Sequence, residues 1–368
     1  MRAAILPFSY PEISSLFPAI GTVHSVVPYG HGHINETYLI TSTANDGSHR
    51  RYVLQKINQR IFKNVPALME NIHRVCAHLA TKSTRAMQLI PTFTGQTYLQ
   101  DPAGDWWRIY DFIEGAHTVE QVSNEAQARE AARAFGAFQS QLADLPGERL
   151  HETIPHFHHT RRRFENLRAA IGADTCGRAV SVPKEIAFAL AREADTDVML
   201  DLLARGEVSE RITHNDTKIN NVMLDDITGR GVAVIDLDTV MPGLALYDFG
   251  EMVRTAASST SEDDPDPTRM HLRLPLFRAL VSGYLETASR VLNATERAHL
   301  GFAGKMMTYE NGIRFLTDYL QGDPYYRIKH PTHNLERCRA QFALVQSIEE
   351  NAPEMARIIT EESSPRVS

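Results

Sequence analysis

The chain has 368 residues and a mass of 41.3 kDa, a size that favours two lobes with a cleft between them over a single core. Hydrophobic residues make up 43% of it and charged residues 23%, proportions that exclude disordered and fibrous proteins. The net charge is −7 and the sequence has no Lys/Arg-rich run, so nucleic acid is not an expected partner.

The sequence has none of the signals of a membrane or secreted protein. No apolar run approaches the roughly 18 residues of a membrane span, and the run before Pro7 is too short for a signal peptide. Cys76, Cys176 and Cys338 are far apart and form no Cys-x-x-Cys pair, which suits a reducing compartment. We expect a cytoplasmic protein without a membrane partner.

The first third of the chain has the period-two pattern of strands. We expect strands at residues 23–29 and 37–41. Two glycines in the turn between them would let backbone amides approach an anion, so this turn is a candidate cover for nucleotide phosphates. A plain hairpin with permissive glycines explains the same turn, which consists of Gly30, His31, Gly32 and His33.

A third strand is expected at residues 51–57, where alternation places Gln55 and Lys56 on opposite faces. Lys56 is a candidate ligand of the nucleotide phosphates, as in kinase-like folds, or an ordinary solvated lysine. Asn64 is expected to cap a helix that runs to Leu79. Together with further strands these elements predict an antiparallel α+β lobe. The further strands are expected at residues 89–93, 97–100 and 106–113.

The segment from Tyr110 to Gly115 is expected to be the hinge between the lobes. If ATP binds, its adenine would use backbone groups of Asp111, Phe112 and Ile113, because main-chain N–H and C=O groups can read the edge of a planar base. The hinge would leave a nucleotide-binding lobe before it and an acceptor-binding lobe after it.

Beyond the hinge the apolar period changes from two to about 3.6, which predicts a mainly helical lobe. We therefore divide the chain into a nucleotide-binding lobe, residues 1–113, and a helical lobe with the catalytic loop and acceptor site, residues 114–368. The first long helix should begin at Ser123 or Asn124 and run to Gln141. Further helices are expected at residues 183–205, 272–287, 295–316 and 334–359.

Three neighbouring histidines, His156, His158 and His159, could suggest metal ligands. No Cys or Glu lies at a supporting interval, so we interpret this segment as a polar wall or loop of the cleft.

The strongest signal lies at His214-Asn-Asp216, which is followed five residues later by Asn221. The pattern His-x-Asp-x-x-x-x-Asn is typical of a phosphoryl-transfer loop, in which the carboxylate meets the acceptor hydroxyl and the amide oxygen reaches a magnesium ion. Two short apolar runs around a Gly-rich turn then predict a hairpin that returns Asp236 beside Asn221. Asp216 is the candidate base, and Asn221 and Asp236 are candidate ligands of Mg2+, which prefers oxygen donors.

Two further carboxylates follow the hairpin. Asp238 is expected to point the same way as Asp236 along a strand, as a second metal or hydrogen-bonding carboxylate, or else to orient the next loop. Asp248 is expected to tie the catalytic loop in place, with His214 as a second supporting residue. The string Asp248-Phe-Gly250 is not the metal motif of protein kinases, because it comes too late and no strand precedes it.

With these motifs in this order, the chain resembles the aminoglycoside phosphotransferase and choline kinase-like superfamily. Within it, four strings closely resemble the N-acetylhexosamine 1-kinases, and the resemblance runs over nearly the full chain. The four strings are residues 29–38, 213–221, 235–243 and 313–320.

The resemblance implies an α+β bilobal, protein-kinase-like fold with a small antiparallel-sheet N-lobe and a large, mainly helical C-lobe. It also implies Mg2+- and ATP-dependent phosphorylation of the anomeric hydroxyl of N-acetylglucosamine and N-acetylgalactosamine. On the matching positions, the implied roles are catalytic base for Asp216, magnesium ligand for Asn221 and Asp236, and sugar contact for His33, Arg314 and Tyr325.

The chain departs from the wider superfamily on its third strand, where the usual basic residue falls on Gln55. Either backbone amides of the glycine turn and the metal suffice for the phosphates, or a bulge turns Lys56 inward.

Two other functions stay open: a kinase of the same fold for another sugar, an amino alcohol or an aminoglycoside, and a non-catalytic nucleotide-binding regulator. A cationic acceptor would call for an acidic or aromatic cage, whereas an N-acetyl sugar calls for hydrogen bonds from Arg, His and Tyr. His33 and Arg314 favour the sugar. We expect a monomer or a weak homo-oligomer.

Overall fold

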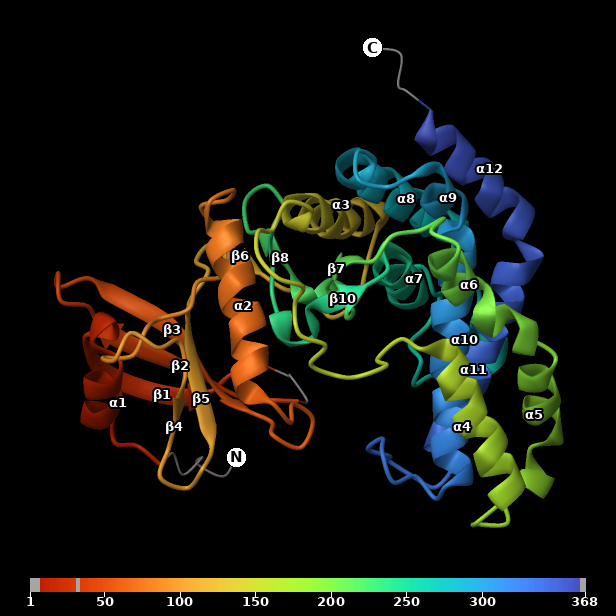
Figure 1. Cartoon of the computed structure of the whole chain (residues 1–368), viewed down its shortest axis with the longest axis horizontal. Coiled ribbons are helices and arrows are strands. Elements are labelled where there is room, and N and C mark those ends of the chain that lie inside the picture. The colour runs from red at the N-terminus through yellow and green to blue at the C-terminus, as the bar shows by residue number, and fades with distance from the viewer. Residues whose placement is uncertain (1–6, 31–33, 365–368) are drawn as a thin grey trace.

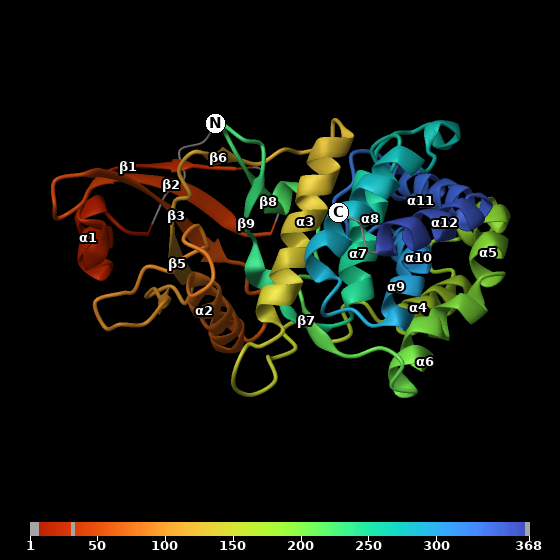
Figure 2. The same ribbon diagram turned by 90° about the horizontal axis from the view of Figure 1, so that it is seen from above.

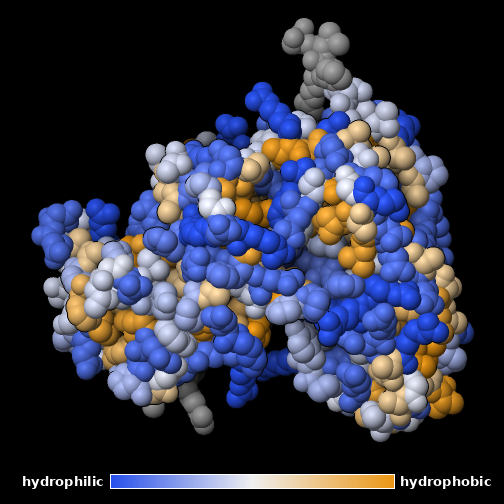
Figure 3. Space-filling view, viewed as in Figure 1, coloured by the Kyte–Doolittle hydropathy of each residue, from blue (hydrophilic) through white to orange (hydrophobic). Residues whose placement is uncertain are grey.

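The computed structural model describes residues 7–30 and 34–364 and shows two lobes of different construction (Figure 1). The N-lobe contains a five-stranded antiparallel sheet, and the C-lobe is mainly helical. The predicted α+β bilobal architecture is confirmed. Hydrophilic residues predominate on the face of the molecule where the two lobes meet (Figure 3).

The N-lobe sheet has the strand order β1-β2-β3-β5-β4. Its strands are β1 (Thr22–Pro28), β2 (Glu36–Thr43), β3 (His49–Ile57), β4 (Leu99–Gln100) and β5 (Trp106–Asp111). Because side chains alternate along a strand, its two faces meet different helices. Tyr52, Leu54 and Trp107 pack toward α1 (Tyr10–Leu16), whereas Ile57 and Tyr110 pack toward α2 (Val65–Ala80).

The start of α2 follows the prediction. The side chain of Asn64 accepts a hydrogen bond from the N–H of Ala67 at 3.1 Å, and Pro66 occupies the first turn, where its missing N–H does no harm. Apolar side chains at helical spacing, among them Leu68 and Ile72, are fully buried against the sheet. The predicted cap is confirmed.

The C-lobe is built around α10 (Leu300–Leu320), which packs against α4 (Thr160–Ala173), α7 (Ala245–Ala256) and α11 (His333–Glu350). Figure 2 shows α3 (Glu125–Leu142) standing between the β8–β9 hairpin and the other helices. The remaining elements are β6 (Ala116–His117), β7 (Arg211–Thr213), β8 (Val222–Asp225), β9 (Gly231–Val234), β10 (Met241–Gly243), α5 (Pro183–Leu190), α6 (Val198–Ala204), α8 (Leu274–Ala288), α9 (Ala294–Ala298) and α12 (Ala352–Ser363).

Two small sheets lie between the hinge segment and the segment around Asp216. β6, directly after the hinge, pairs with β8, and β8 pairs with β9, while β7 pairs with β10. The segments before and after the catalytic loop are therefore both held by strand pairing.

Glycines let α3 and α8 approach each other closely. A Cβ at Gly283 would lie 2.1 Å from the carbonyl oxygen of Arg129, and one at Gly136 would lie 2.6 Å from that of Tyr284. Larger residues would force the helices apart.

Three predicted helices are interrupted. The helix predicted at residues 183–205 breaks into α5, a 3-10 turn at Glu193–Asp197 and α6, and the hydroxyl of Thr196 bonds back to the carbonyl of Glu193 in that turn. The helix predicted at residues 295–316 divides at His299 into α9 and α10. The helix predicted at 334–359 divides at Asn351, because Pro353 fits only in a first turn.

Three other segments also differ from the prediction. The helices α1 and α4 were not predicted. Residues 89–93 form no strand and contribute only an isolated bridge between Leu89 and Tyr110, since Pro91 has no N–H to offer a neighbouring strand. None of the helices within residues 7–30 and 34–364 combines the length and the apolar content needed to cross a membrane.

Candidate active site

The catalytic loop is anchored by Asp248 on α7, a residue that is 1% exposed. Its Oδ2 accepts a hydrogen bond from the N–H of His214 at 2.9 Å, and its Oδ1 accepts one from the N–H of Asn215 at 2.7 Å. Nε2 of Gln139 on α3 donates to Oδ2 at 2.9 Å. Burial raises the pKa of Asp248, an effect that these hydrogen bonds from His214, Asn215 and Gln139 oppose. The carboxylate of Asp248, on α7, therefore fixes the backbone of the loop at His214 and Asn215.

His214 joins this loop to the end of the hairpin. Its ring packs edge-on against Phe135 and Phe138 of α3, its Nε2 donates to the carbonyl of Ile235 at 2.9 Å, and its Nδ1 accepts from the N–H of Asp216 at 3.3 Å.

Asn215 makes the turn that presents Asp216. Its φ of 63° lies in the left-handed region, which asparagine tolerates better than most residues. Its Nδ2 donates to the carbonyl of Thr239 at 2.9 Å, and its Oδ1 accepts from Oγ1 of Thr213 at 3.0 Å. The turn leaves the side chain of Asp216 24% exposed, so a substrate hydroxyl could reach its carboxylate.

Asp216 is paired with Lys218, whose Nζ lies 2.9 Å from Oδ1. Burial works to raise the pKa of Asp216, but the charge and hydrogen bond of Lys218, with a smaller contribution from Arg254, hold it below its usual value. The carboxylate is therefore ionised at neutral pH, as a proton acceptor must be.

The chain returns beside Asn221 just before Asp236, through the hairpin that the sequence predicts. The hairpin of β8 and β9 closes with a hydrogen bond from the N–H of Ile235 to the carbonyl of Asn221 at 2.9 Å. Nδ2 of Asn221 donates to the backbone carbonyl of Asp216 at 2.8 Å and to its Oδ2 at 3.2 Å. Its Oδ1 has no hydrogen-bond partner within the described part of the chain and is free to bind a cation.

The surroundings of Asp236 fit a divalent cation. Burial first, then the charges of Asp238 and Asp216, raise the pKa of Asp236 to about 7. Repulsion of this kind among carboxylates is relieved by a hard cation, which takes carboxylate and amide oxygens and leaves its other positions to water and phosphate. Within the described ranges no group of three or more His, Cys, Asp or Glu could hold a metal. Asn221 and Asp236 therefore stay the two candidate metal ligands predicted from the sequence.

Asp238 does not continue a strand beyond Asp236, and this expectation is corrected. Asp236 has φ and ψ of 60°, and Asp238 lies in the 3-10 turn η5 (Leu237–Thr239) that follows. Its Oδ1 lies 2.6 Å from Nη1 of Arg108 on β5, and its Oδ2 accepts a hydrogen bond from Nδ2 of Asn35. Both oxygens are engaged by the N-lobe.

The nucleotide candidates are only partly brought together. His31, Gly32 and His33 lie outside the described residues, and Gly30 has a φ of 77°, which favours glycine. Nζ of Lys56 lies 2.6 Å from Asp105 and 3.9 Å from Glu36. Lys56 lies on the same face of the sheet as Leu54 and Trp107, and Gln55 lies on the opposite face. Lys56 is therefore not brought to the site.

The hinge candidates lie between the lobes. The N–H of Asp111 bonds to the carbonyl of Gln88 at 2.9 Å, and the N–H of Phe112 bonds to the carbonyl of Arg51 at 3.3 Å. Neither backbone group of Ile113 has a hydrogen-bond partner in the part of the chain that the structure describes. Ile113 thus offers a free donor and acceptor at the hinge.

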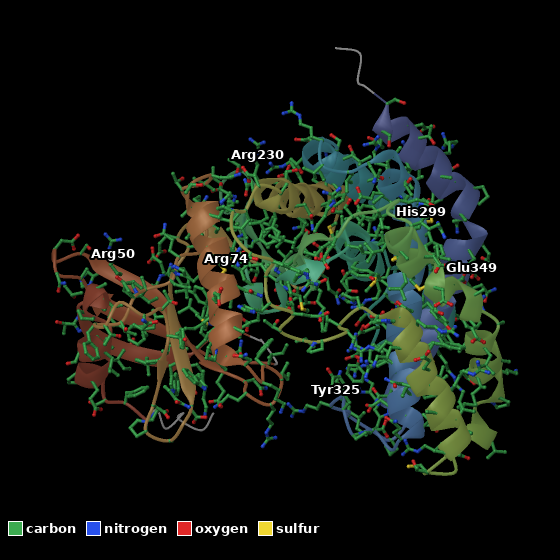
Figure 4. The ribbon with its side chains drawn as sticks, in the orientation of Figure 1. Arg50, Arg74, Arg230, His299, Tyr325 and Glu349 are labelled. Carbon is green, nitrogen blue, oxygen red and sulfur yellow. The ribbon has the colours of Figure 1, made fainter. Side chains whose placement is uncertain are left out.

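Arg314 on α10 and Tyr325 on the loop that follows it lie on one side of the C-lobe. Tyr325 is 68% exposed and is turned toward the N-lobe (Figure 4), and its N–H is held by Oδ1 of Asp318 at 2.8 Å. The guanidinium of Arg314 lies 5.7 Å from the ring of Tyr326 and forms no ion pair or hydrogen bond with any described residue.

A second arginine, Arg163 on α4, lies near Arg314. Burial, followed by the charge of Arg314, lowers the pKa of Arg163. Its Nε is buried without a hydrogen-bond partner in the described ranges, as is the hydroxyl of Tyr326. Buried polar groups without a partner are uncommon in folded proteins, so both groups are exceptional within this lobe.

The catalytic loop and this arginine side are connected through a buried histidine. His158 lies with Nε2 3.0 Å from the carbonyl oxygen of Asn215 and Nδ1 3.0 Å from Oε1 of Glu310. Glu310 also accepts from Oγ1 of Thr160 at 2.6 Å, and it precedes Arg314 by one turn of α10. Of the three neighbouring histidines, His158 thus connects the loop at Asn215 with Glu310 of α10, and both of its ring nitrogens are occupied by these contacts.

Comparison with known families identifies the chain. A model of the phosphotransferase enzyme family matches residues 25–288, which include the catalytic loop and the hairpin. The chain belongs to this family. The match covers the N-lobe sheet and the first helices of the C-lobe, and it ends at the last residue of α8.

Solved structures share the fold of this phosphotransferase at low sequence identity. Spectinomycin phosphotransferase, in complex with ADP and spectinomycin, matches with a TM-score of 0.56 and 12% identity over 97% of this chain and 99% of that chain. Amicoumacin kinase, in complex with AMP-PNP and Ca2+, matches with a TM-score of 0.57 and 13% identity over 96% and 91%. Ethanolamine kinase of Plasmodium vivax matches with a TM-score of 0.53 and 16% identity over 87% and 82%.

Sequence reasoning did not find the contacts of four residues around this site: Asn35, Arg108, His158 and Lys218. Of these only His158 had been interpreted, as part of a polar wall or loop of the cleft. Two of them had a local signal. Lys218 stands two residues after Asp216, and Arg108 is the one cation within an apolar and aromatic strand run, where a buried arginine needs a partner. Asn35 and His158 had no such signal, because their partners are distant in the sequence.

Proposed function

We propose that this phosphotransferase uses ATP and Mg2+ to phosphorylate the anomeric C1 hydroxyl of N-acetylhexosamines, N-acetylglucosamine and N-acetylgalactosamine, giving the sugar 1-phosphate and ADP. The observation that carries the proposal is the link from the catalytic loop through His158 and Glu310 to Arg314. Because Glu310 precedes Arg314 by one turn of α10, this link supports a position for Arg314 near the loop that carries Asp216.

Asp216 would act as the base. An anomeric hydroxyl is more acidic than an ordinary alcohol because the ring oxygen withdraws electron density. A carboxylate held ionised by Lys218 needs only to orient this hydroxyl and accept its proton late in the reaction. Lys218 is placed to balance negative charge that develops beside Asp216.

Asn221 and Asp236 would hold Mg2+ through Oδ1 of the amide and the carboxylate. The ion, when bound, neutralises charge on the phosphates of ATP. The crowding of carboxylates that raises the pKa of Asp236 supports this role.

The N-lobe, residues 1–113, would bind the nucleotide, and residues 114–368 would bind the acceptor. The turn of Gly30, His31 and Gly32 would cover the phosphates, and the free backbone groups of Ile113 would bond to the adenine edge with help from its neighbours Asp111 and Phe112. His33, from the same turn, would reach the sugar.

The arginine pair favours a neutral acceptor over a cationic one. Arg163 and Arg314 repel each other, and neither is in an ion pair with a described carboxylate. Choline, ethanolamine or an aminoglycoside would bring a further positive charge to these arginines, whereas the carbonyl and hydroxyl oxygens of an N-acetyl sugar can accept their hydrogen bonds. Arg314 and the exposed Tyr325 would contact the sugar.

The test is incubation with Mg2+ and ATP and a panel of N-acetylglucosamine, N-acetylgalactosamine, glucose, galactose, choline, homoserine and an aminoglycoside, followed by phosphorus NMR. We expect a phosphate coupled to the anomeric proton of an N-acetyl sugar. Phosphate on another acceptor would support the second candidate, a kinase of the same fold for a different small alcohol. Nucleotide binding with no acceptor phosphorylated would support a non-catalytic regulator.

An Arg314→Gln variant sharpens this test. We expect KM for the N-acetyl sugar to rise about tenfold or more, because a charge-assisted hydrogen bond is lost, while KM for ATP stays within about twofold. Arg290→Gln, a change in the turn that follows α8, serves as the matched control.

A further inference from the structure

Arg108 is a buried cation whose partners come from both lobes. Its side chain is 1% exposed, and its Nη1 lies 2.6 Å from Oδ1 of Asp238 in the C-lobe, whose side chain is 3% exposed. Its Nε and Nη2 both donate to Oε1 of Gln55 on β3, at 3.0 and 2.8 Å. Because a buried charge needs partners, the ion pair with Asp238 and the two hydrogen bonds to Gln55 together hold the guanidinium in place.

The arrangement differs from the one expected of a kinase-like N-lobe. The third-strand position that would carry a lysine is Gln55, and the facing part of α2 offers Met69, whose Sδ lies 3.8 Å from Nη1 of Arg108. The neighbouring Glu70 turns away to Nε2 of His151 at 2.8 Å. The buried cation of the sheet is thus paired across the lobes and not with α2.

Asp238 connects Arg108 to the candidate metal ligand. Asp238 lies in the 3-10 turn η5, which begins directly after Asp236. Asp236 itself has a left-handed conformation, with φ and ψ of 60°. A non-glycine residue in that conformation is strained and persists only where its surroundings hold it. Asn35, just beyond the glycine turn, donates to Oδ2 of Asp238, and its own Oδ1 accepts from the N–H of Asn58 at 2.9 Å.

We propose that Arg108 is a positioning residue for the magnesium–nucleotide complex. Acting through Asp238, it holds the turn that presents the carboxylate of Asp236 to the metal, and Asn35 holds the other oxygen of Asp238. The ion pair of Arg108 with Asp238, between the lobes, then takes the positioning role of the lysine–glutamate pair that lies within the N-lobe of protein kinases. The inference rests on the proposed metal ligands and not on the identity of the acceptor.

The test measures nucleotide binding without any acceptor. AMP-PNP is titrated calorimetrically into wild type, Arg108→Gln, Asp238→Asn and the double variant, in EDTA and over a series of Mg2+ concentrations. For each variant we expect affinity in EDTA within about threefold of wild type, and the Mg2+ concentration for half-maximal enhancement raised about 10- to 100-fold, as for other residues that orient a metal ligand. The double variant should be no worse than the poorer single variant, because the two residues act as one unit.

Arg85→Gln is the matched control. Arg85 also joins the lobes, with Nη1 2.6 Å from Oδ2 of Asp225, but it does not contact the turn at Asp236. We expect its Mg2+ dependence to equal that of wild type. If Arg85→Gln shifts that dependence as much as Arg108→Gln, lobe closure in general is responsible and the proposal is overturned.

Two other results would also overturn it. One is an unchanged Mg2+ dependence in a variant whose far-UV circular dichroism shows a native fold. The other is a wild type whose affinity for AMP-PNP is the same with and without Mg2+, which would remove the proposed metal ligands as well. Should Arg108→Gln fail to fold, Asp238→Asn and Arg108→Lys carry the comparison, and Arg108→Lys is expected to lie between wild type and Asp238→Asn.

Discussion

His158 and Glu310 form a buried pair beneath the catalytic loop, with Nδ1 of the imidazole 3.0 Å from Oε1 of the carboxylate. The other ring nitrogen faces the carbonyl oxygen of Asn215 at 3.0 Å. Neither an ionised carboxylate nor a carbonyl can donate a proton, so both hydrogen bonds require the doubly protonated imidazolium. The histidine is therefore charged in the folded protein.

This pair should make stability depend on pH. Burial lowers the pKa of His158, but Glu310 outweighs it and holds that pKa above the ordinary 6.5. Although burial acts the other way, His158 holds the pKa of Glu310 below its ordinary 4.5. The contribution of the imidazolium is fully present below pH 6.5 and is lost as the pH rises through the raised pKa, whereas that of the carboxylate is present above pH 4.5 and is lost as the pH falls through the lowered pKa.

We therefore expect the Tm of His158→Gln to fall furthest below that of wild type between pH 4.5 and 6.5, and the gap to narrow above that window. Calorimetry from pH 4 to pH 9 measures it. His151→Gln, which alters an exposed pair with Glu70, should change Tm little at any pH. A gap for His158→Gln that stays constant over this range would contradict the charged pair.

Asp216→Asn should abolish turnover while nucleotide binding survives. The amide keeps the shape of the side chain but cannot accept a proton, so we expect kcat to fall about 1,000-fold or more, with ATP affinity within about threefold. A coupled ADP assay and calorimetry measure the two quantities. Asp226→Asn, on the exposed turn of the hairpin, should leave kcat and ATP affinity unchanged. Retained turnover in the Asp216→Asn variant would show that Asp216 is not the base.

Asp248→Ala should destabilise the whole C-lobe. The change leaves the buried N–H groups of His214 and Asn215 without their acceptor, and we expect a loss of about 3 kcal/mol in the free energy of unfolding. Urea denaturation followed by circular dichroism measures it. Asp46→Ala, at an exposed turn of the N-lobe, should lose far less stability than Asp248→Ala. Equal losses at the two positions would disprove the anchoring role.

Gly283→Ala should disrupt the contact between α3 and α8. The new Cβ would lie 2.1 Å from the carbonyl oxygen of Arg129, so the helices must separate, at about 3 kcal/mol of stability. Gly172→Ala, on α4 with nothing within 4 Å of its Cβ, should stabilise the protein by about 0.5–1 kcal/mol through helix propensity. Thermal unfolding of the two variants compares them directly, and a neutral Gly283→Ala would show that the helices can move apart freely.

Local spacing accounts for what could be predicted of the fold and the site. The alternation of residues 51–57 and the cap at Asn64 depend on near neighbours, and the structure shows β3 and α2 there. The distance between Asp216 and Asn221 is likewise set within one loop, and the Gly-rich turn of the hairpin returns the chain toward Asn221. Helix interruptions at Thr196 and Asn351 escaped prediction because apolar periodicity continues across them.

From the sequence came the two-lobed α+β class, the phosphoryl-transfer pattern and the residues Asp216, Asn221 and Asp236, because each is encoded by residues close along the chain. Only the tertiary structure showed that Lys56 faces away from the site, that Asp238 is held by Arg108, and that His158 meets Glu310, 152 residues away. A polar residue in a sequence is equally compatible with solvent and with a buried partner. That choice is made when the lobes pack, since an ion pair excluded from water must find its partner wherever the fold places it.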